Sequence, residues 1–404
     1  MKRSFNIVVA GAGIVGLTLA GLLAQSGQAG RFAIRVIDGG ERPRFDPGAD
    51  VALRVSAISA GSAAILASLG AWEKVLAERA GVFREMRVWD ASQSPDGPEA
   101  LRFSAAEFAL PELGFIVENV LLQDALLQIL EDSGVVPEFS KAVESLRPGT
   151  GAGVDVVCAD GEVLSADLLI GADGTASSIR RHAKIAVTSW RYPQFAFVSH
   201  LRPEKDHGEC AWQRFLPGGP LALLPLHDGR VSVVWSTSPE QAQEARDASD
   251  LRLGSMLTEA SDRVLGKLSA AGSRGSFQLK AQYAVRYVTP GIALAGDAAH
   301  NIHPLAGQGA NLGIADAALL AEIVSGAVAA GEYPGDVPVL RRYERGRKGA
   351  NKTMLYFVDG LHRLFSSPSA RAGKLRGAGM RLFNASGPLR KRAVAMALGL
   401  DRRL

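Results

Sequence analysis

The chain has 404 residues, with 47% hydrophobic and 21% charged residues and a net charge of +4. This composition excludes an intrinsically disordered chain, and the length is enough for about two packed domains. Cys158 and Cys210 lie far apart without metal-ligand spacing, so we expect a reducing compartment, no disulfide framework and no metal site. Because no run of about 18 apolar residues is present and the first strand begins at once, we expect neither a membrane span nor a signal peptide.

A nucleotide-binding unit of strand, tight turn, helix and second strand is predicted over residues 5–38. Gly11, Gly13 and Gly16 form the pattern G-x-G-x-x-G between the first strand and the helix. In this pattern the first glycine permits the turn, the second lets a pyrophosphate approach the backbone, and the third lets the helix pack on the sheet. Asp38 ends the second strand, where it can accept a hydrogen bond from a ribose hydroxyl. The alternative is a glycine turn used only for packing.

The following elements alternate between loop, helix and strand. In chain order we expect a loop over 39–56, a helix reaching Glu78 with Gly70 near a helix end, paired strands over 82–104, a helix from Asn119 to a stop at Gly134, a hairpin and buried strand over 154–171, antiparallel strands over 185–285 with a helix over 250–268, and helices over the last ~55 residues.

This order predicts an α/β fold in which a Rossmann-like nucleotide domain is interrupted by a β-rich substrate domain and followed by a C-terminal helical region. The expected boundaries are 1–75, 100–183 and 282–345 for the nucleotide domain, 76–99 and 184–281 for the substrate domain, and 346–404 for the C-terminal region. The β-rich part contains several bulky apolar residues, which are consistent either with a hydrophobic substrate channel or with an ordinary sheet core. These residues are Phe195, Phe197, Trp212, Phe215, Leu223, Leu224 and Trp235.

A second glycine-rich segment follows a strand at residues 292–295. Asp297 stands at the carboxyl end of this strand, where it can hold a sugar hydroxyl chain. The next loop is rich in small residues and opens a long helix near Asn311, whose backbone N–H groups face an anion and favour the negative charge of a reduced flavin. The sequence therefore predicts a flavoenzyme. One fingerprint holds one dinucleotide, so a nicotinamide donor must bind transiently elsewhere.

A third segment, GADGTASSIR at residues 171–180, follows the buried strand. Asp173 and Gly174 make a turn at the strand end. Ser177 and Arg180 lie about one helical turn apart and can face phosphate or the hydride donor. The alternative is an ordinary turn.

The three segments together resemble the single-component aromatic hydroxylase flavoproteins of the para-hydroxybenzoate hydroxylase fold, over essentially the whole chain. Within that group the chain is similar to the ubiquinone-biosynthesis hydroxylases, which act on polyprenylated phenols. The motifs that carry this likeness are RVSAIS from Arg54, Glu118-Asn119, HPLAGQGANLG from His303 followed by Asp316, and the run YERGRKGANKTMLYFVDGLHRLFS over 343–366.

The resemblance implies tightly bound FAD in a Rossmann-like FAD-binding domain. The implied contacts are Gly11, Gly13, Gly16 and Asp38 for the ADP half, Arg54 and Asn119 along the flavin chain, Asp173 in the GADG segment, Asp297 for the ribityl oxygens, and Pro304, Gly307, Gln308, Gly309 and Asn311 along the isoalloxazine. Asp38 departs from the more usual Glu and shortens the reach to the ribose.

The resemblance also implies that NADH or NADPH reduces FAD, that O₂ adds at flavin C4a, and that the hydroperoxide hydroxylates an electron-rich ring. His300 and His303 are the titratable groups nearest the predicted flavin. We assign His303 a polar role near the substrate ring and the Pro304 carbonyl a role in orienting the substrate; the alternative for His303 is a structural histidine.

The C-terminal segment from Arg371 carries nine Lys or Arg residues and one acid, Asp401, among apolar residues. This mixture suits an anionic lipid surface or an acidic partner protein, the alternative being a solvated helical face. We therefore expect a cytoplasmic protein, peripheral on the inner face of the membrane. Expected partners are a polyprenylphenol-type lipid, O₂ and quinone-biosynthesis proteins, with a homodimer or higher oligomer and no nucleic acid.

Other functions remain open at the level of sequence. A hydroxylase of small soluble aromatics would share every flavin motif, and a non-catalytic FAD-containing subunit of a quinone-biosynthesis complex would show no NADH oxidation. A flavin halogenase is disfavoured because the W-x-W-x-I-P segment is absent.

Overall fold

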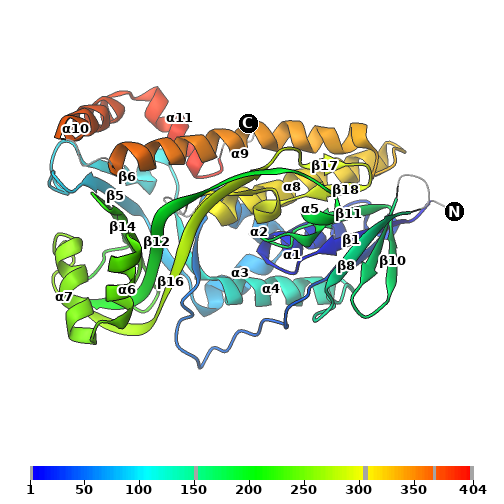
Figure 1. The fold of residues 1–404 in the computed structure, drawn as a ribbon, viewed down its shortest axis with the longest axis horizontal. Helices are drawn as coiled ribbons and strands as arrows, with labels where there is room; N and C mark the ends of the chain where they lie inside the picture. The colour runs from blue at the N-terminus through cyan, green and yellow to red at the C-terminus, as the bar shows by residue number, and fades with distance from the viewer. Residues whose placement is uncertain (1–2, 150–152, 304–307, 367–369, 401–404) are drawn as a thin grey trace.

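The computed structural model describes residues 3–149, 153–303, 308–366 and 370–400. Two lobes, each built on a sheet, lie side by side and are joined by long strands and one long helix (Figure 1). The first lobe contains a five-stranded sheet in the order β17 (Val288–Thr289), β18 (Ile292–Leu294), β11 (Leu168–Gly171), β1 (Phe5–Ala10) and β2 (Phe32–Ile37).

The four strands from β18 to β2 are parallel, as expected for a doubly wound nucleotide domain. β1 lies in the middle and is buried at every position except Asn6, which explains its continuous apolar run. Helices pack around this sheet: α1 (Ile14–Ala24) contacts α4 (Asn119–Asp132) and α8 (Gln308–Ala329). The predicted βαβ unit and the expected α/β class are confirmed.

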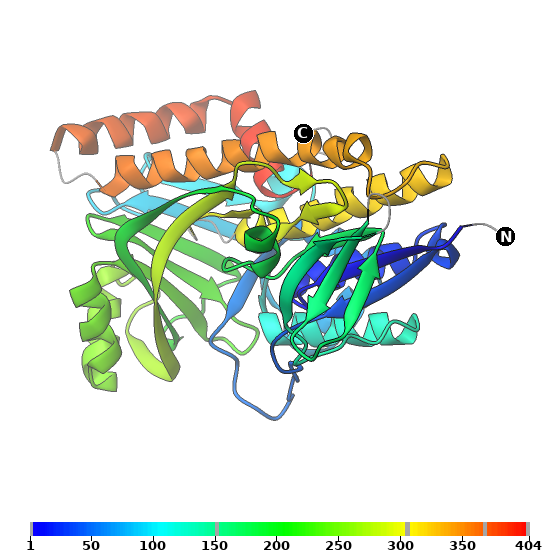
Figure 2. The same ribbon diagram turned by 45° about the vertical axis from the view of Figure 1, so that its right-hand side comes forward.

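The second lobe contains an eight-stranded sheet. Its order is β19 (His300–Asn301), β16 (Leu268–Ala284), β12 (Val187–Pro203), β15 (Val231–Thr237), β14 (Gly219–Pro225), β13 (Cys210–Leu216), β5 (Glu85–Asp90) and β6 (Leu101–Ser104). β12 and β16 have 17 residues each and form a twisted antiparallel ribbon that reaches from one lobe to the other (Figure 2). Helices α6 (Pro239–Asp247) and α7 (Asp250–Ala260) flank this sheet.

Two small sheets complete the first lobe. One has the order β3 (Val55–Ser59), β7 (Gly114–Glu118), β4 (Gly81–Phe83), and the other is the meander β8 (Val143–Pro148), β9 (Val154–Cys158), β10 (Val163–Ala166). The remaining helices of this lobe are α2 (Ala60–Ser68), α3 (Ala71–Glu78) and α5 (Ser178–His182).

The sequence predictions for individual elements have mixed outcomes. Gly70 separates α2 from α3 with φ +79°, and Gly134 follows α4 with φ +81°, as their positions indicate. The helix expected over 56–78 begins only at Ala60, because residues 55–59 form β3. The helix expected over 250–268 ends at Ala260. The stretch 101–104, expected in the nucleotide domain, is β6 at the edge of the large sheet, because it pairs with β5.

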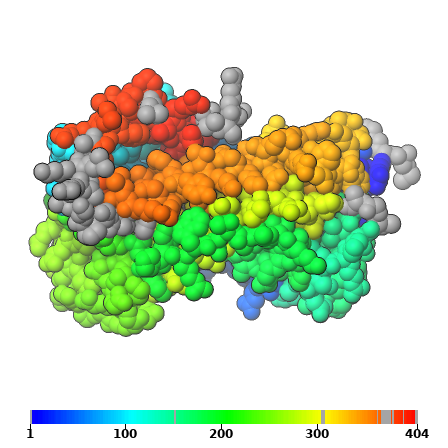
Figure 3. All heavy atoms as spheres, turned by 45° about the horizontal axis from the view of Figure 1, so that its top comes forward, coloured from blue at the N-terminus to red at the C-terminus, as the bar shows by residue number. Residues whose placement is uncertain are grey.

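The C-terminal region is helical, with α9 (Val337–Ser366), α10 (Ala370–Ala385) and α11 (Pro388–Ala397). α9 runs along both lobes, and α10 and α11 lie beside its C-terminal part (Figure 3). Met354, Val358 and Phe365 of α9 are buried against the large sheet, whereas Phe357 is exposed.

Several basic residues of this region pair with acids of the chain itself. Arg376 forms a buried ion pair with Asp90 at 2.7 Å, and Arg390 contacts Glu107 at 2.5 Å. The Leu398 carbonyl accepts a hydrogen bond from the Gly61 N–H at 2.9 Å, so the end of the described chain reaches back to α2. These contacts attach α10 and α11 to the rest of the fold.

One described helix, α8, is long and apolar enough to cross a membrane by length and composition. The expectation that no such segment exists is therefore wrong as a statement about composition. Half of its most apolar window is buried, and it packs between α1 and α9, as a core helix does.

Candidate flavin site

The three predicted motifs meet at one edge of the five-stranded sheet. Gly11, Asp173 and Asp297 follow the carboxyl ends of β1, β11 and β18, which are consecutive parallel neighbours. Backbone hydrogen bonds continue the pairing just beyond the strands, from Ala172 N to Ala10 O at 2.8 Å and from Ala295 N to Gly171 O at 3.0 Å. The carboxyl edge of such a sheet is where nucleotides bind.

In the glycine turn, Gly11 and Gly16 are closely packed, whereas Gly13 has open space beside it. A Cβ on Gly11, whose φ is +113°, would lie 2.3 Å from the Ala172 carbonyl oxygen, and one on Gly16 would lie 1.9 Å from the Gly11 oxygen. A Cβ on Gly13 meets no described atom within 4 Å. Gly13 is also the N-cap of α1 and provides no side-chain cap. The first N–H groups of α1 therefore face open space, as an anion site requires.

Asp38 lies beside this turn at the end of β2. Its Oδ2 accepts a hydrogen bond from Ala12 N at 2.7 Å, and its Oδ1 accepts one from Gly40 N at 2.7 Å. Each carboxylate oxygen has a further lone pair, so the group can still accept from a hydroxyl. Asp38 thus holds the glycine turn in place and remains available to a ribose.

Arg54 and Asn119 are neighbours through their backbones. The Asn119 N–H donates to the Arg54 carbonyl at 3.0 Å, and the Asn119 side chain accepts from Ser56 Oγ at 2.7 Å. The Arg54 side chain is exposed and makes no hydrogen bond or ion pair within the described ranges. Helix α4 begins at Asn119 as expected, but the side chain does not cap it because it is paired with β3.

Asp297 lies in the short turn after β18. Its Oδ2 accepts weak hydrogen bonds from Thr175 Oγ1 at 3.3 Å and from Asn301 Nδ2 at 3.4 Å. Its Oδ1 accepts none from the part of the chain that the structure describes. The hydroxyls of a polyol chain could therefore donate hydrogen bonds to this carboxylate.

Asp173 and Arg180 are engaged within the fold. Asp173 accepts hydrogen bonds from Ser177 Oγ at 2.5 Å, Ser178 N at 2.6 Å and Ile179 N at 3.1 Å, so it fixes the start of α5. Arg180 is buried and donates to the Ala298 carbonyl at 2.7 Å. Its guanidinium joins the GADG segment to the turn after β18 instead of facing phosphate.

The helix start at α8 contributes open backbone and one anchored side chain. A Cβ on Gly309 would meet no described atom within 4 Å. Gln308 is the first residue of α8. The buried Asn311 side chain donates to the Ala57 carbonyl at 2.8 Å and accepts from Ser59 N at 2.9 Å, so it ties α8 to β3. Pro304 and Gly307 lie outside the described residues.

His300 belongs to a buried network centred on Asp316. Asp316 is fully buried and accepts from His300 Nε2 at 2.5 Å, Arg347 Nε at 2.6 Å, Asn351 Nδ2 at 3.0 Å and Gly296 N at 3.1 Å. Burial alone would raise the pKa of Asp316, but the charges of His300 and Arg347 outweigh burial and lower it. An ionised Asp316 therefore fixes Gly296, the residue before Asp297.

His303 is buried and packs edge-on against Tyr192, with ring centroids 4.9 Å apart. The Tyr192 hydroxyl donates to Asp359 Oδ1 at 2.9 Å. Burial and this carboxylate both raise the pKa of Tyr192, so the phenol is neutral at physiological pH. His303 therefore sits in a packed environment at the junction of β12 and α9.

The bulky residues of the large sheet divide between two cores. Phe197, Leu223 and Trp235 are buried against Leu253 and Leu257 of α7. They form an ordinary core and do not line a channel. Phe215 instead faces the opposite side and stacks on Phe365 of α9, with ring centroids 3.9 Å apart: this is the face toward the C-terminal helices.

Sequence reasoning missed two sets of residues. Arg347 and Asn351 lie four residues apart on α9, a spacing that signals one helix face, but nothing in the sequence pairs them with Asp316. The contacts that hold residues 46–54 are equally invisible in the sequence. No cluster of three potential metal ligands is found among the described residues.

The donor set of this edge fits FAD. An uncapped helix start with free space at Gly13 suits a pyrophosphate, Asp38 suits a ribose, and the free oxygen of Asp297 suits a ribityl chain. The exposed Arg54 adds a positive charge on the side of β3.

Comparisons with known proteins agree with this reading. The family described as FAD binding domain matches residues 4–357. The 3-demethoxyubiquinol 3-hydroxylase of Escherichia coli is 36% identical over 402 residues and covers 98% of both chains. The human mitochondrial ubiquinone biosynthesis monooxygenase COQ6 is 36% identical and covers 97% of this chain and 92% of its own. The structure of Klebsiella pneumoniae HpxO complexed with FAD and uric acid superposes with a TM-score of 0.75 at 19% identity, covering 99% and 98%.

Proposed function

This chain belongs to the FAD-binding-domain family and, within it, to the ubiquinone-biosynthesis hydroxylases, and on that premise we propose that it hydroxylates the aromatic ring of a polyprenylated phenol. It is an FAD-dependent aromatic-ring monooxygenase. The observation that carries the proposal is the shared carboxyl edge of the neighbouring strands β2, β1, β11 and β18, beyond which lie Asp38, the uncapped start of α1, and Asp297.

The cofactor contacts are assigned by their chemistry. The N–H groups at Gly13 and the first turn of α1 bind the pyrophosphate, Asp38 binds the adenosine ribose, Asp297 binds the ribityl chain, and Arg54 faces the flavin chain. When bound, FAD supplies the acceptor for the hydride of NAD(P)H and the centre that activates O₂.

The chain's own residues orient these contacts. Asp316 holds Gly296 and His300, and thereby fixes the turn that presents Asp297. Asn311 ties the start of α8 to β3, so the helix start keeps its place against this strand. We assign His303 and the Pro304 carbonyl to the substrate ring, supported by their position in the chain directly after β19 and before α8.

The test is ring hydroxylation by the purified holoprotein. It should be yellow, oxidise NADH or NADPH only in the presence of the phenol, and place one atom of ¹⁸O₂ in the product. Phenols with long and short prenyl tails separate the lipid substrate from a small aromatic one. A colourless protein that refuses added FAD refutes the flavin assignment, and equal turnover of tail-less phenols refutes the lipid substrate.

Peripheral contact with an anionic membrane is part of the proposal. Leu382 on α10 has 73% of its surface exposed, and Lys391 and Arg392 on α11 are exposed as well. Leu382→Glu should therefore weaken sedimentation with anionic vesicles. Leu251→Glu on α7, where the leucine is 79% exposed, is the matched control. Equal weakening by both variants, or no binding of the unmodified protein, contradicts the contact.

A further inference from the structure

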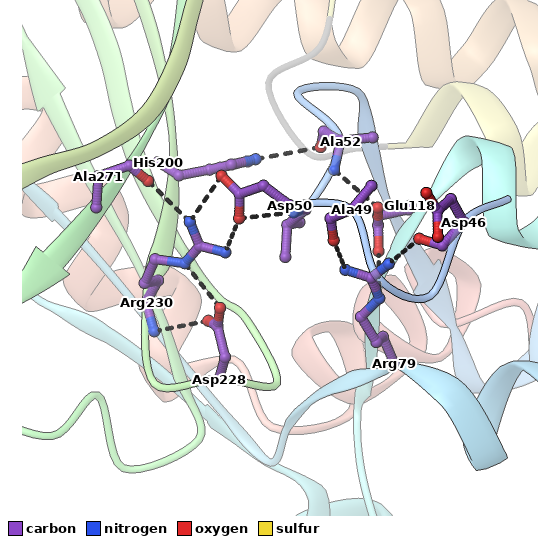
Figure 4. Close-up of polar contacts among 11 residues, drawn as sticks. Asp46, Ala49, Asp50, Ala52, Arg79, Glu118, His200, Asp228, Arg230 and Ala271 are labelled. Carbon is purple, nitrogen blue, oxygen red and sulfur yellow. Dashed lines mark hydrogen bonds and ion pairs between the residues drawn. The ribbon is translucent and has the colours of Figure 1, made fainter.

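The loop before β3 starts and ends in the first lobe and also contacts the second lobe. We call residues 46–54 the bridging loop; it is irregular and largely exposed, and it ends at Arg54 (Figure 1). Contacts from both lobes hold it, and most of its partners come from side chains that are themselves buried (Figure 4). An exposed loop held in this way has a defined conformation.

The first lobe holds the loop through Arg79 and Glu118. Arg79, at the end of α3, donates to the carbonyls of Asp46 at 2.8 Å and Ala49 at 2.9 Å. Glu118 accepts from Ala52 N at 2.7 Å, and its other oxygen lies 3.4 Å from Arg79 Nε. The Glu118 side chain is 4% exposed, so this attachment is screened little by solvent.

The second lobe holds the same loop through Arg230 and His200. Arg230 contacts Asp50 Oδ1 at 2.6 Å from the turn before β15, and its side chain is 9% exposed. Asp228 at 2.7 Å and the Ala271 carbonyl at 2.8 Å fix its guanidinium. His200 Nε2 lies 3.1 Å from the Ala52 carbonyl, to which it donates because a carbonyl only accepts.

These contacts converge on the residues just before Arg54. Ala52 is bound on its N–H by Glu118 and on its carbonyl by His200, and it precedes Arg54 by two residues. The Arg54 side chain makes no hydrogen bond or ion pair within the described ranges, so the position of its backbone sets the region that its guanidinium can reach. The hydrogen bond with Arg230 lowers the pKa of Asp50, in agreement with an ionised pair.

We propose that Arg230 and His200, two residues of the second lobe, are positioning residues for the flavin. By holding Asp50 and Ala52 they determine the position of the Arg54 backbone. The proposal rests on the assignment of Arg54 to the cofactor made above. The second lobe is thereby connected to the cofactor site through the bridging loop.

The test is the dissociation constant of FAD from the apoprotein, measured by quenching of flavin fluorescence. Asp50→Asn should raise it about tenfold, the loss expected for one charged hydrogen bond. Asp50→Glu, which keeps the charge, should recover most of the affinity. Glu244→Gln, which breaks the exposed pair with Arg252 in the same lobe, is the control and should change nothing.

The double variants distinguish positioning from a general structural role. In an Arg54→Ala background, Asp50→Asn should have no further effect on FAD affinity, because both changes act through one guanidinium. His200→Ala reaches Arg54 by a different contact and should show the same non-additivity, and thermal melting of each apoprotein confirms folding. Multiplying effects, or an unchanged affinity of Asp50→Asn, overturn the inference while leaving the proposed function intact. Failure of the unmodified protein to bind FAD refutes the flavin assignment itself.

Discussion

Replacing Asp316 by Asn should destabilise the protein more than any single change at an exposed ion pair. The carboxylate is fully buried and accepts four hydrogen bonds, including those from Arg347 and His300. The side-chain NH2 group of Asn would face these hydrogen-bond donors without being able to accept from them, and the positive charge of Arg347 would lose its counter-charge. Removing one partner of a buried pair costs about 3–5 kcal/mol of unfolding free energy.

This free energy converts to a measurable melting shift. With an unfolding entropy of about 2.1 cal/mol/K per residue, a chain of 404 residues loses about 4–6 °C in Tm. Differential scanning calorimetry of the apoprotein measures it. Glu332→Gln, which breaks the exposed pair with Arg342 between α8 and α9, is the control and should shift Tm by less than about 1 °C.

The double variant Asp316→Asn with Arg347→Met tests the reason for the loss. The second change removes the uncompensated charge. The double variant should therefore lose less unfolding free energy than the sum of the losses in the two single variants. FAD affinity should fall in both, since the Gly296 N–H loses its acceptor. A shift of Asp316→Asn within about 1 °C of zero, or simple additivity, would refute the reasoning.

Three further changes have separable outcomes. Gly11→Ala should destabilise the apoprotein, because φ is positive at this position and the new Cβ would collide with the Ala172 oxygen. Gly13→Ala should leave Tm unchanged and weaken FAD binding at least about tenfold. Calorimetry and FAD titration separate the two effects, and equal losses of Tm would contradict this prediction. Asp90→Asn should loosen α10 by removing the buried partner of Arg376, seen as faster hydrogen exchange in α10 alone; unchanged protection there contradicts it. Burial lowers the pKa of His200, so on acidification this histidine is protonated in the unfolded chain before it is protonated in the folded protein. The unfolding free energy should therefore fall as the pH drops below about 6.5. His200→Gln should flatten this part of the curve of Tm against pH, and an unchanged curve contradicts the prediction.

The sequence predicted the parts of the site that are local in the chain. The turn at Gly11–Gly16 and the acid at Asp38 lie within one βαβ unit, so spacing and periodicity suffice to place them. Gly16 could be assigned for the same reason, because its Cβ would meet the oxygen of Gly11 in the same turn. The Ala172 oxygen beside Gly11 belongs to a distant part of the chain and is brought there by strand pairing. The convergence with Asp297 follows from the rule that parallel strand ends share an edge.

The contacts that depend on packing could not be predicted. Asp50 and Arg230 are 180 residues apart in the chain, and only the assembled lobes bring them together. The basic C-terminal region is the clearest case, because a count of charges cannot show that Arg376 and Arg390 are paired with Asp90 and Glu107. Deleting this region would therefore expose the buried Asp90, so point variants such as Leu382→Glu are the sounder test of membrane contact.

The long elements that cross between the lobes determine how the molecule can move. β12 and β16 pair along the crossing except for register shifts between Arg191 and Phe195 and between Ser199 and Leu201, and α9 contacts β17 in one lobe and β13 and β14 in the other (Figure 2). These three elements connect the two lobes directly. We therefore expect any relative motion of the lobes to be small and to be concentrated at the irregular part of β12.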